Sequence, residues 1–193
     1  MPTTSPCDRW LVAGCNPRVT EVEPPDGVRT IGLNDHTSVT RCDELVVCDA
    51  PNTFTAQRRQ ALVEAEVERF WHRDVDPWER ERLDDKRRPI KIVHATQWRG
   101  DYYDGVVPCY FTSLPAGIVL AVRGGARRIG VLACDMVMHP ALGPYVGYIN
   151  DMLRNMRRDL ARLGIEIANV SPRGLSTRLQ FERQDLPWLS SST

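Results

Sequence analysis

Six short apolar runs, spaced along the chain, constrain its fold more than any other feature of the sequence. Their apolar residues are rich in β-branched side chains and are nearly continuous instead of alternating with polar ones. This pattern is typical of strands that are buried on both faces of a parallel sheet. The runs are WLVAG (10–14), VRTIGL (28–33), ELVVCD (44–49), IKIVHA (90–95), RIGVLACD (128–135) and IEIANVS (165–171).

Segments with helical periodicity lie between these runs. Apolar residues recur at helical spacing over 55–71, where Thr53 or Thr55 is a candidate N-cap. Over 142–163 the apolar residues are three and four apart, and Gly164 then ends the predicted helix. The segment 114–122 predicts a third, more apolar helix that is buried. Together these elements predict an α/β fold, a three-layer sandwich around a mostly parallel, Rossmann-like sheet.

Composition bounds the domain count and the partners. The 193 residues suit a single domain. Lysine plus arginine and aspartate plus glutamate both number 25, so net charge predicts no overall attraction to nucleic acid or to anionic lipid. The six cysteines form no C-x-x-C pair, which indicates reduced thiols. The N-terminus lacks an apolar leader and no run approaches the roughly 18 apolar residues of a membrane span, so we expect a cytoplasmic protein.

Four of the predicted strands are followed by small or polar residues. Parallel α/β sheets bind ligands outside the carboxyl ends of their strands, so these residues are candidates for a binding site. Asn, Asp and Pro are also ordinary turn residues that satisfy local backbone groups, and this structural alternative stays open for each strand end. The four sequences are GCNPR (14–18), NDH (34–36), DAPN (49–52) and DMVMH (135–139).

The order of these residues resembles a known superfamily. A G-x-x-P follows the first strand, the second strand ends in Gly-x-Asn, and the third ends in Asp. A Thr-Ser pair then opens a helix of small residues, and Gly-Ala-x-x-Ile precedes a strand that ends in Asp. This order, over about 10–181, resembles the sialyltransferase-like superfamily. That superfamily includes bacterial surface-glycan sialyltransferases, 6-hydroxymethylpterin pyrophosphokinase-like proteins and small versions from phage genomes.

The resemblance implies site residues. It implies that Asp135 lies beside the reacting groups and that His139, which precedes the last amphipathic helix, is the catalytic base. It implies nucleotide-binding roles for Gly14, Pro17, Asn34, Asp49, Thr112, Ser113 and Ser171.

The first turn differs from the family pattern. The family usually has Gly-x-Gly-Pro-Ser, whereas this chain has Gly-Cys-Asn-Pro-Arg. Asn16 stands where the second glycine is usual, and asparagine tolerates a left-handed backbone better than most residues. Arg18 stands where the serine is usual and is a candidate to contact a donor phosphate. The segment between Asp135 and the following helix is also shorter than in the sialyltransferases.

The expected chemistry is transfer from a nucleotide-containing donor. Backbone amides after Thr112 and Ser113 would offset its phosphate charge. His139 and His36 are candidate bases, because the ordinary pKa of histidine lies near neutrality. We therefore expect a glycosyltransferase that uses a nucleotide sugar and requires no further cofactor. Two alternatives stay open: a pyrophosphokinase using ATP and Mg²⁺, with Asp49 or Asp135 as metal ligands, and a catalytically inactive module that binds a nucleotide or a partner chain.

Three further features lie away from the strand ends. DVD (74–76) matches the Asp-x-Asp pairs that hold divalent cations in many nucleotide-sugar transferases, but its charged surroundings also suit a solvated loop. The range 73–105 is a candidate lid or acceptor-binding insertion, and its aromatic segment 96–105 suits stacking or an ordinary loop. The last helix has an arginine face that suits solvation or, alternatively, a nucleic-acid acceptor. This face consists of Arg154, Arg157, Arg158 and Arg162.

Overall fold

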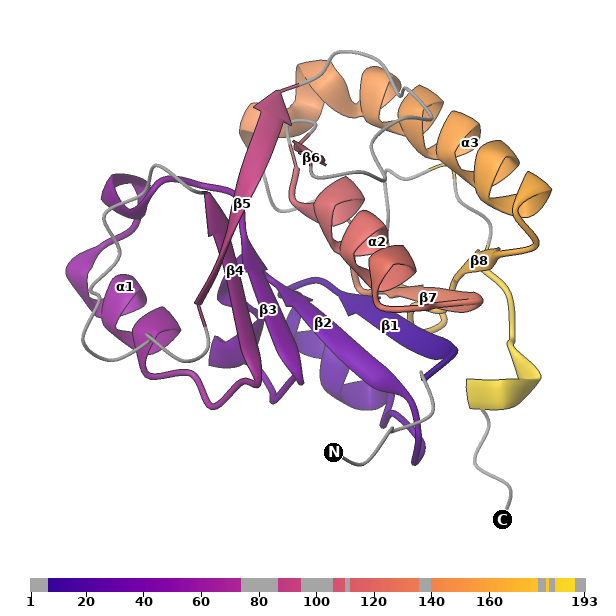
Figure 1. Ribbon diagram of the computed structural model, residues 1–193, viewed down its shortest axis with the longest axis horizontal. Coiled ribbons are helices and arrows are strands. Elements are labelled where there is room, and N and C mark those ends of the chain that lie inside the picture. Colours follow the sequence, from indigo (N-terminus) through magenta and orange to yellow (C-terminus); the bar gives the residue numbers. More distant parts are fainter. Residues whose placement is uncertain are drawn as a thin grey trace.

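The computed structural model describes residues 7–73, 87–94, 106–109, 112–135, 140–176, 180 and 183–189. Within them, an eight-stranded sheet forms the centre, and every pair of neighbouring strands runs parallel (Figure 1). The predicted α/β class is therefore confirmed. The strands are β1 (Arg9–Ala13), β2 (Arg29–Leu33), β3 (Glu44–Val47), β4 (Arg69–Arg73), β5 (Arg87–His94), β6 (Val106–Cys109), β7 (Arg128–Leu132) and β8 (Glu166–Asn169).

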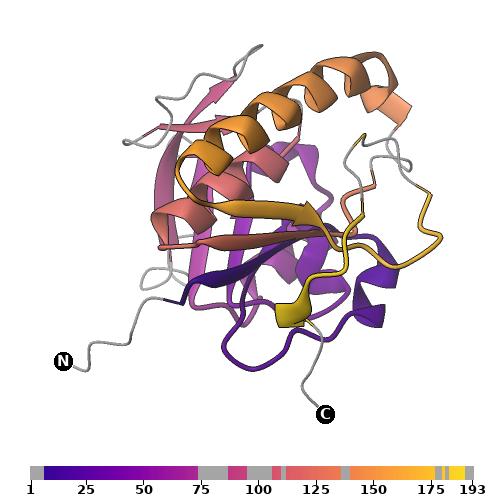
Figure 2. The ribbon, with the colours of Figure 1, turned by 90° about the vertical axis from the view of Figure 1, so that its right-hand side faces the viewer.

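Helices cover both faces of this sheet. Helices α2 and α3 lie on one face, and α1 with the 3₁₀ helix η1 lies on the other (Figures 1 and 2). The predicted three-layer sandwich is thus confirmed. The helices are α1 (Ala56–Val63), α2 (Leu114–Arg123), α3 (Val146–Arg162), and the 3₁₀ helices η1 (Pro17–Glu21), η2 (Asn34–Ser38), η3 (Pro51–Thr53), η4 (Pro140–Tyr145) and η5 (Pro187–Leu189).

The order of the strands reverses at β1. The sheet runs β6-β5-β4-β3-β2-β1-β7-β8, so β1 pairs with β2 on one side and with β7 on the other. The chain leaves β1 toward η1 on one face, and it continues from β7 to α3 on the opposite face. Such a switch point is the place where parallel α/β sheets bind ligands.

Successive residues of β1 face opposite layers, as the side-chain alternation of a strand requires. Trp10 and Val12 belong to the hydrophobic cluster that includes α2 and α3. Leu11 and Ala13 belong to the cluster that includes η1 and Leu186. All four side chains are buried, which explains why this run contains no polar residue.

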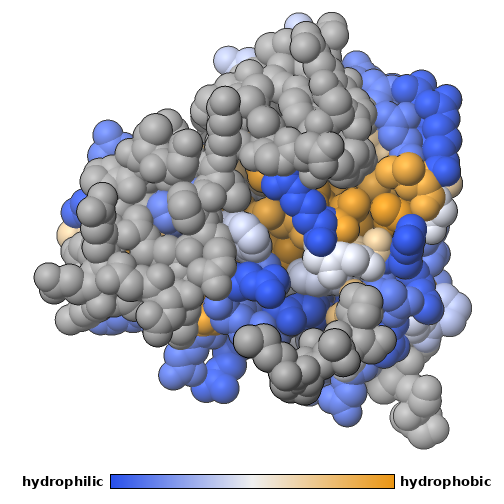
Figure 3. All heavy atoms as spheres, viewed as in Figure 1, coloured by the Kyte–Doolittle hydropathy of each residue, from blue (hydrophilic) through white to orange (hydrophobic). Residues whose placement is uncertain are grey.

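Helix α2 lies directly on the sheet and is buried from Leu114 to Ala121, as its apolar sequence predicts. Gly117 allows the close approach, because a Cβ there would lie 2.7 Å from Val12 Cγ1 and 2.8 Å from Leu33 Cδ2. The space-filling view of this face shows hydrophobic residues gathered over α2, flanked by hydrophilic ones (Figure 3).

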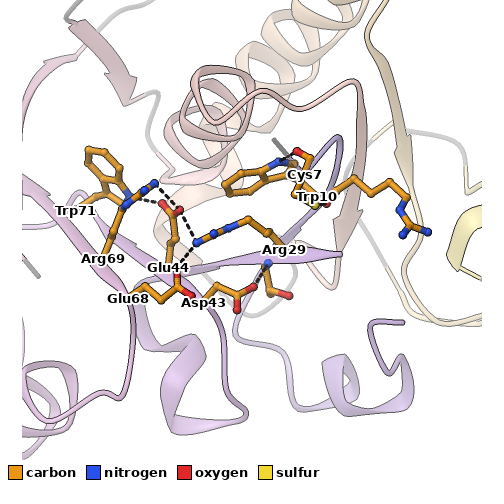
Figure 4. A network of polar contacts seen from close by, with 10 residues as sticks. Cys7, Trp10, Arg29, Asp43, Glu44, Glu68, Arg69 and Trp71 are labelled. Carbon is orange, nitrogen blue, oxygen red and sulfur yellow. Dashed lines mark hydrogen bonds and ion pairs between the residues drawn. The ribbon is translucent and has the colours of Figure 1, made fainter. Parts of the chain in front are cut away.

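A polar network joins the amino ends of β2, β3 and β4 (Figure 4). Glu44 is only 1% exposed, and its carboxylate accepts hydrogen bonds from Arg29 Nη2 at 3.1 Å, Arg69 Nη1 at 3.0 Å and Trp71 Nε1 at 2.6 Å. The Arg29 guanidinium also lies 5.2 Å from the centroid of the Trp10 ring. We call this group the Glu44 network.

The helix predicted over 55–71 is wrong in its second half. Helix α1 ends at Val63, and the chain then forms β4 beside β3. Val67 and Phe70 are buried against α1, which explains their apolar character. Their helical spacing is coincidental, because Glu68 N donates to Asp43 O at 2.7 Å and begins the parallel pairing. Strand β6 was not predicted, since it is short and contains a proline.

The range 73–105 is divided by β5, which pairs with β4 and β6 inside the sheet. The lid or acceptor-binding role can therefore concern only 74–86 and 95–105. Both segments lie outside the described residues, as do DVD (74–76) and the aromatic segment 96–105.

Within the described residues, five cysteine side chains form no disulfide: Cys7, Cys15, Cys42, Cys48 and Cys134. Burial raises the pKa of Cys42 to about 12, and burial together with the charges of Cys15 and Asp135 raises the pKa of Cys134. These two thiols are thus core residues without nucleophilic character. Among the described helices, none combines the length and the apolar composition needed to cross a membrane.

Candidate functional site

The carboxyl ends of β1, β2, β3 and β7 and the start of α2 bring most of the predicted site residues in the described part of the chain to one edge of the sheet. We call this region the switch-point edge. At its centre, the chain segments after β1 and β7 approach each other closely, and Gly14 N donates to Leu132 O at 2.8 Å. A Cβ on Gly14 would lie 2.4 Å from Ala133 O, so only glycine fits. The glycine of the predicted turn is therefore required by the packing of the two backbones.

Asn16 joins the two sides of the switch point. Its Nδ2 donates to Asp135 Oδ2, and its Oδ1 accepts from Arg18 N at 2.9 Å, which caps η1. Pro17 occupies the first position of η1, where its missing N–H leaves nothing unsatisfied. The backbone of Asn16 is extended, with φ −67° and ψ 130°, so the expected left-handed conformation is wrong. An asparagine here serves through its amide group and not through its backbone.

Arg18 lies at this turn but is engaged by other groups. Its Nε and Nη2 donate to Glu21 Oε1 at 2.6 Å and Oε2 at 2.9 Å. Nη2 also donates to Arg173 O at 3.0 Å. The hydrogen bond to Glu21 raises the pKa of Arg18, and the same bond lowers the pKa of Glu21. A bidentate phosphate contact through Nε and Nη2 of Arg18 would require the exchange of Glu21.

Asn34 connects three elements. Its Nδ2 donates to Asp49 Oδ2 at 3.2 Å, and its Oδ1 accepts from Ser113 Oγ at 3.0 Å. Its φ of 48° is left-handed, a conformation for which asparagine is favoured among residues with a Cβ. Asp49 is exposed, whereas the preceding Val47 and Cys48 are buried. The Asp49 carboxylate thus lies at the solvent-exposed edge of the sheet, as the strand pattern predicted.

The start of α2 contributes two hydroxyl groups. Thr112 Oγ1 accepts a long hydrogen bond of 3.4 Å from Leu114 N, while Ser113 directs its hydroxyl to Asn34. Ser113 is 3% exposed and makes no side-chain cap of its own helix. The start of α2 therefore lies beside the end of β2.

The turn after β7 has a strained backbone, and a serine that follows β8 bonds to it. Ala133 has a φ of 53°, which is unfavourable for a residue with a Cβ. Ser171 follows β8, and its Oγ accepts from Ala133 N at 2.8 Å. Ser171 is 8% exposed, and its own N donates to Asn169 Oδ1 at 3.0 Å. This hydroxyl positions the turn that presents Asp135, which itself is 9% exposed.

His36 is not available as a base. It is 1% exposed, and its Nδ1 lies 2.7 Å from Gly14 O, so the neutral ring donates to this carbonyl. Burial lowers the pKa of His36, and the carbonyls of Gly14 and Arg41 only partly oppose this effect. A Cβ on Gly32 would lie 2.6 Å from the His36 ring, which shows how closely the ring is packed. His36 thus supports the turn at Gly14 through this hydrogen bond. The other candidate base, His139, lies outside the described residues.

Two further features of this edge were missed by the sequence reasoning. Cys15 is exposed between Gly14 and Asn16. Partial desolvation by the surrounding edge raises its pKa most, and the carboxylates of Asp35 and Asp135 raise it further. Arg58 of α1 forms an ion pair with Asp35. No local motif marks these contacts, because they join segments that are distant in the sequence.

The described residues contain no group of three His, Cys, Asp or Glu side chains arranged to hold a metal ion. The arginine face of α3 is partly neutralised within the helix: Arg154 pairs with Asp151, and Arg158 and Arg162 pair with Asp159. Such pairs suit a solvated helix surface.

Comparisons with known proteins give one structural likeness. No family model matches the chain, and no curated protein matches it. Among solved structures, the chain is similar to the sialyltransferase CstII from Campylobacter jejuni, which was analysed in complex with a substrate analogue, CMP-3FNeuAc. The sequences are 12% identical, the TM-score is 0.48, and the match covers 92% of this chain and 88% of that chain. At this similarity, the match gives no residue of this chain a role.

Proposed function

We propose that this chain is a transferase that binds a nucleotide-containing donor at the switch-point edge and moves a glycosyl group to an acceptor hydroxyl. The observation that carries the proposal is the convergence of small polar side chains from the ends of four strands and the start of α2 at this edge. Asn16 and Asp135 join β1 to β7, and Asn34 joins Asp49 to the start of α2. The order of these residues along the chain is also the order that resembles the sialyltransferase-like superfamily.

The side chains suit the parts of such a donor. Asp49 is exposed and, among the described residues, one amide bonds its Oδ2, so Oδ1 can accept hydrogen bonds from ribose hydroxyls. Asp135 is nearly buried, and a carboxylate there stabilises positive charge that develops at the anomeric carbon as the bond to the phosphate oxygen breaks. In this proposal the acceptor oxygen forms the new bond, its proton passes to His139, and the phosphate leaves with the nucleotide.

Calorimetry with nucleoside monophosphates and nucleotide sugars tests the proposal. We expect the wild type to bind at least one of them, and Asn34→Ala and Asp135→Asn to weaken this binding by about three- to tenfold each, because each variant loses one or two hydrogen bonds. Arg162→Gln, on the exposed face of α3, is the control and should bind as the wild type does. Absence of binding across the panel, or equal binding by all variants, contradicts the proposal.

Turnover separates the alternatives. Release of free nucleotide from a nucleotide sugar, dependent on an acceptor, supports the glycosyltransferase. Consumption of ATP that requires Mg²⁺ identifies a pyrophosphokinase instead. Binding without release of nucleotide at high protein concentration identifies a catalytically inactive module.

A further inference from the structure

Arg58 places a guanidinium group at the switch-point edge. It belongs to the first turn of α1, where its backbone N donates to the N-cap hydroxyl of Thr55 at 3.3 Å. Its guanidinium donates to Asp35 Oδ2 and lies 4.7 Å from the centroid of the Phe54 ring. The ring is buried, so it fixes the direction in which the arginine side chain extends.

Asp35 links this guanidinium to the polar groups of the edge. Its partner Asp35 directly follows Asn34, which holds Asp49 and Ser113. Cys15 precedes Asn16, and the carboxylates of Asp35 and Asp135 raise the pKa of its thiol while Arg58 lowers it. Arg58 is thus within electrostatic reach of the turn that carries the Asn16–Asp135 pair.

A phosphate group needs a cation at this edge, because Asp35, Asp49 and Asp135 all bring negative charge to it. Arg18 and Arg58 differ in what they can offer. The Nε and Nη2 groups of Arg18 donate to Glu21, and Nη2 also donates to Arg173 O, so its bidentate edge is already engaged. Within the described residues, Arg58 makes a hydrogen bond to one carboxylate oxygen only, which leaves most of the five guanidinium N–H groups for another acceptor.

We propose that Arg58 binds a phosphate group of the donor, and that Asp35 holds the guanidinium in place until the donor arrives. This inference rests on the proposed function. The side chains of Arg58 and Asp35 are 47% and 25% exposed, so their ion pair is weak and exchanges easily. A phosphate offers bidentate acceptors to the guanidinium plane, which favours the exchange.

Binding of ribonucleoside 5′-monophosphates (AMP, GMP, CMP and UMP) and of the matching nucleosides tests this role, because the two sets differ only in the phosphate. We expect Arg58→Gln to weaken the binding of the monophosphate on the order of ten- to a hundredfold, while nucleoside affinity stays within about twofold of the wild type. Arg59→Gln removes a neighbouring exposed arginine from the same helix and should leave both affinities unchanged.

Asp35→Asn distinguishes a phosphate ligand from a structural tie between α1 and η2. It breaks the same ion pair but keeps the guanidinium, so we expect monophosphate affinity to stay equal or to rise. Equal losses in Arg58→Gln and Asp35→Asn would overturn the inference, as would an Arg58→Gln loss that is the same for nucleosides. If the wild type binds neither the monophosphates nor the nucleosides, the proposed function itself fails. This failure is seen in the wild type alone, so it is distinguished from a failure of the Arg58 inference, which is seen only in the variants. Thermal melting verifies that each variant is folded.

Discussion

The two edges of the sheet carry polar networks of opposite kinds. At the amino edge, Glu44 is buried and its carboxylate is saturated by Arg29, Arg69 and Trp71. At the switch-point edge, the groups are small, Asp49 is exposed, and Asn16 and Asn34 are half-buried. Among the described residues, Asp49 accepts a hydrogen bond from Asn34 alone. A network whose acceptors are all hydrogen-bonded, such as the Glu44 network, stabilises the strands that it joins. A network with unfilled acceptors, such as that of the switch-point edge, keeps hydrogen-bonding capacity for a ligand.

The largest expected effect tests the amino edge. Glu44→Gln leaves two guanidinium groups without their shared carboxylate, and we expect the free energy of unfolding to fall by about 3 kcal/mol. Denaturant titration measures the loss, and Glu68→Gln is the control. Glu68 is 61% exposed and also pairs with Arg29, so its removal should change stability by less than about 1 kcal/mol.

If the edges differ as we propose, folded Glu44→Gln protein binds nucleotide as the wild type does. A loss of nucleotide binding in this variant would show that the amino edge also serves the ligand and would remove the distinction.

The next effect tests the centre of the switch-point edge. In Gly14→Ala the new Cβ meets the Ala133 carbonyl, and backbone cannot move aside as a side chain can. We expect stability to fall by about 2 kcal/mol and nucleotide binding to be lost. Gly147→Ala in helix α3 is the matched control, because no atom lies within 4 Å of the Cβ that this substitution adds. It should leave stability unchanged or raise it by up to about 1 kcal/mol. Equal stability of Gly14→Ala and wild type would refute the close approach of β1 and β7.

Much of the fold could be predicted from the sequence, for a physical reason. Central strands such as β1 and β7 are buried on both faces, so they appear as continuous apolar runs. Strand β4 was missed, because RFWHR begins and ends in arginine and follows a helical segment without a glycine or proline between them. Whether Phe70 extends a helix or starts a strand depends on its pairing with β3, which is a long-range contact.

The site was predictable in part. Strand ends identified Asn16, Asn34, Asp49 and Asp135, because parallel topology delivers carboxyl ends to one edge. The bonds between them join residues that are 15 to 119 positions apart, and no spacing rule contains that information. For the same reason His36 seemed a candidate base, although its ring is packed beneath Gly14. Arg58 was not predicted, because no motif in its helical segment marks it.

The smallest expected effect concerns the chemistry of Cys15. Because desolvation and the charges of Asp35 and Asp135 raise its pKa, the thiol is protonated at neutral pH and its alkylation should accelerate as pH rises. Asp35→Asn and Asp135→Asn remove one charge each, which lowers the pKa and should increase the alkylation rate at pH 7.5 by a few fold. Peptide mass spectrometry follows Cys15 separately, and buried Cys42 should stay unmodified. A slower reaction in both variants would contradict the assigned electrostatics.

The central claim is that ligand binds at the switch-point edge and not at the amino edge. Residue-resolved ¹H–¹⁵N NMR with the tightest-binding nucleoside monophosphate tests it most directly. We predict the largest amide shifts at Cys15, Asn34, Asp49, Ser113 and Asp135, with little change at Arg29, Glu44 and Arg69. Saturable binding whose largest shifts fall on the Glu44 network, with none at the switch-point edge, would contradict the account.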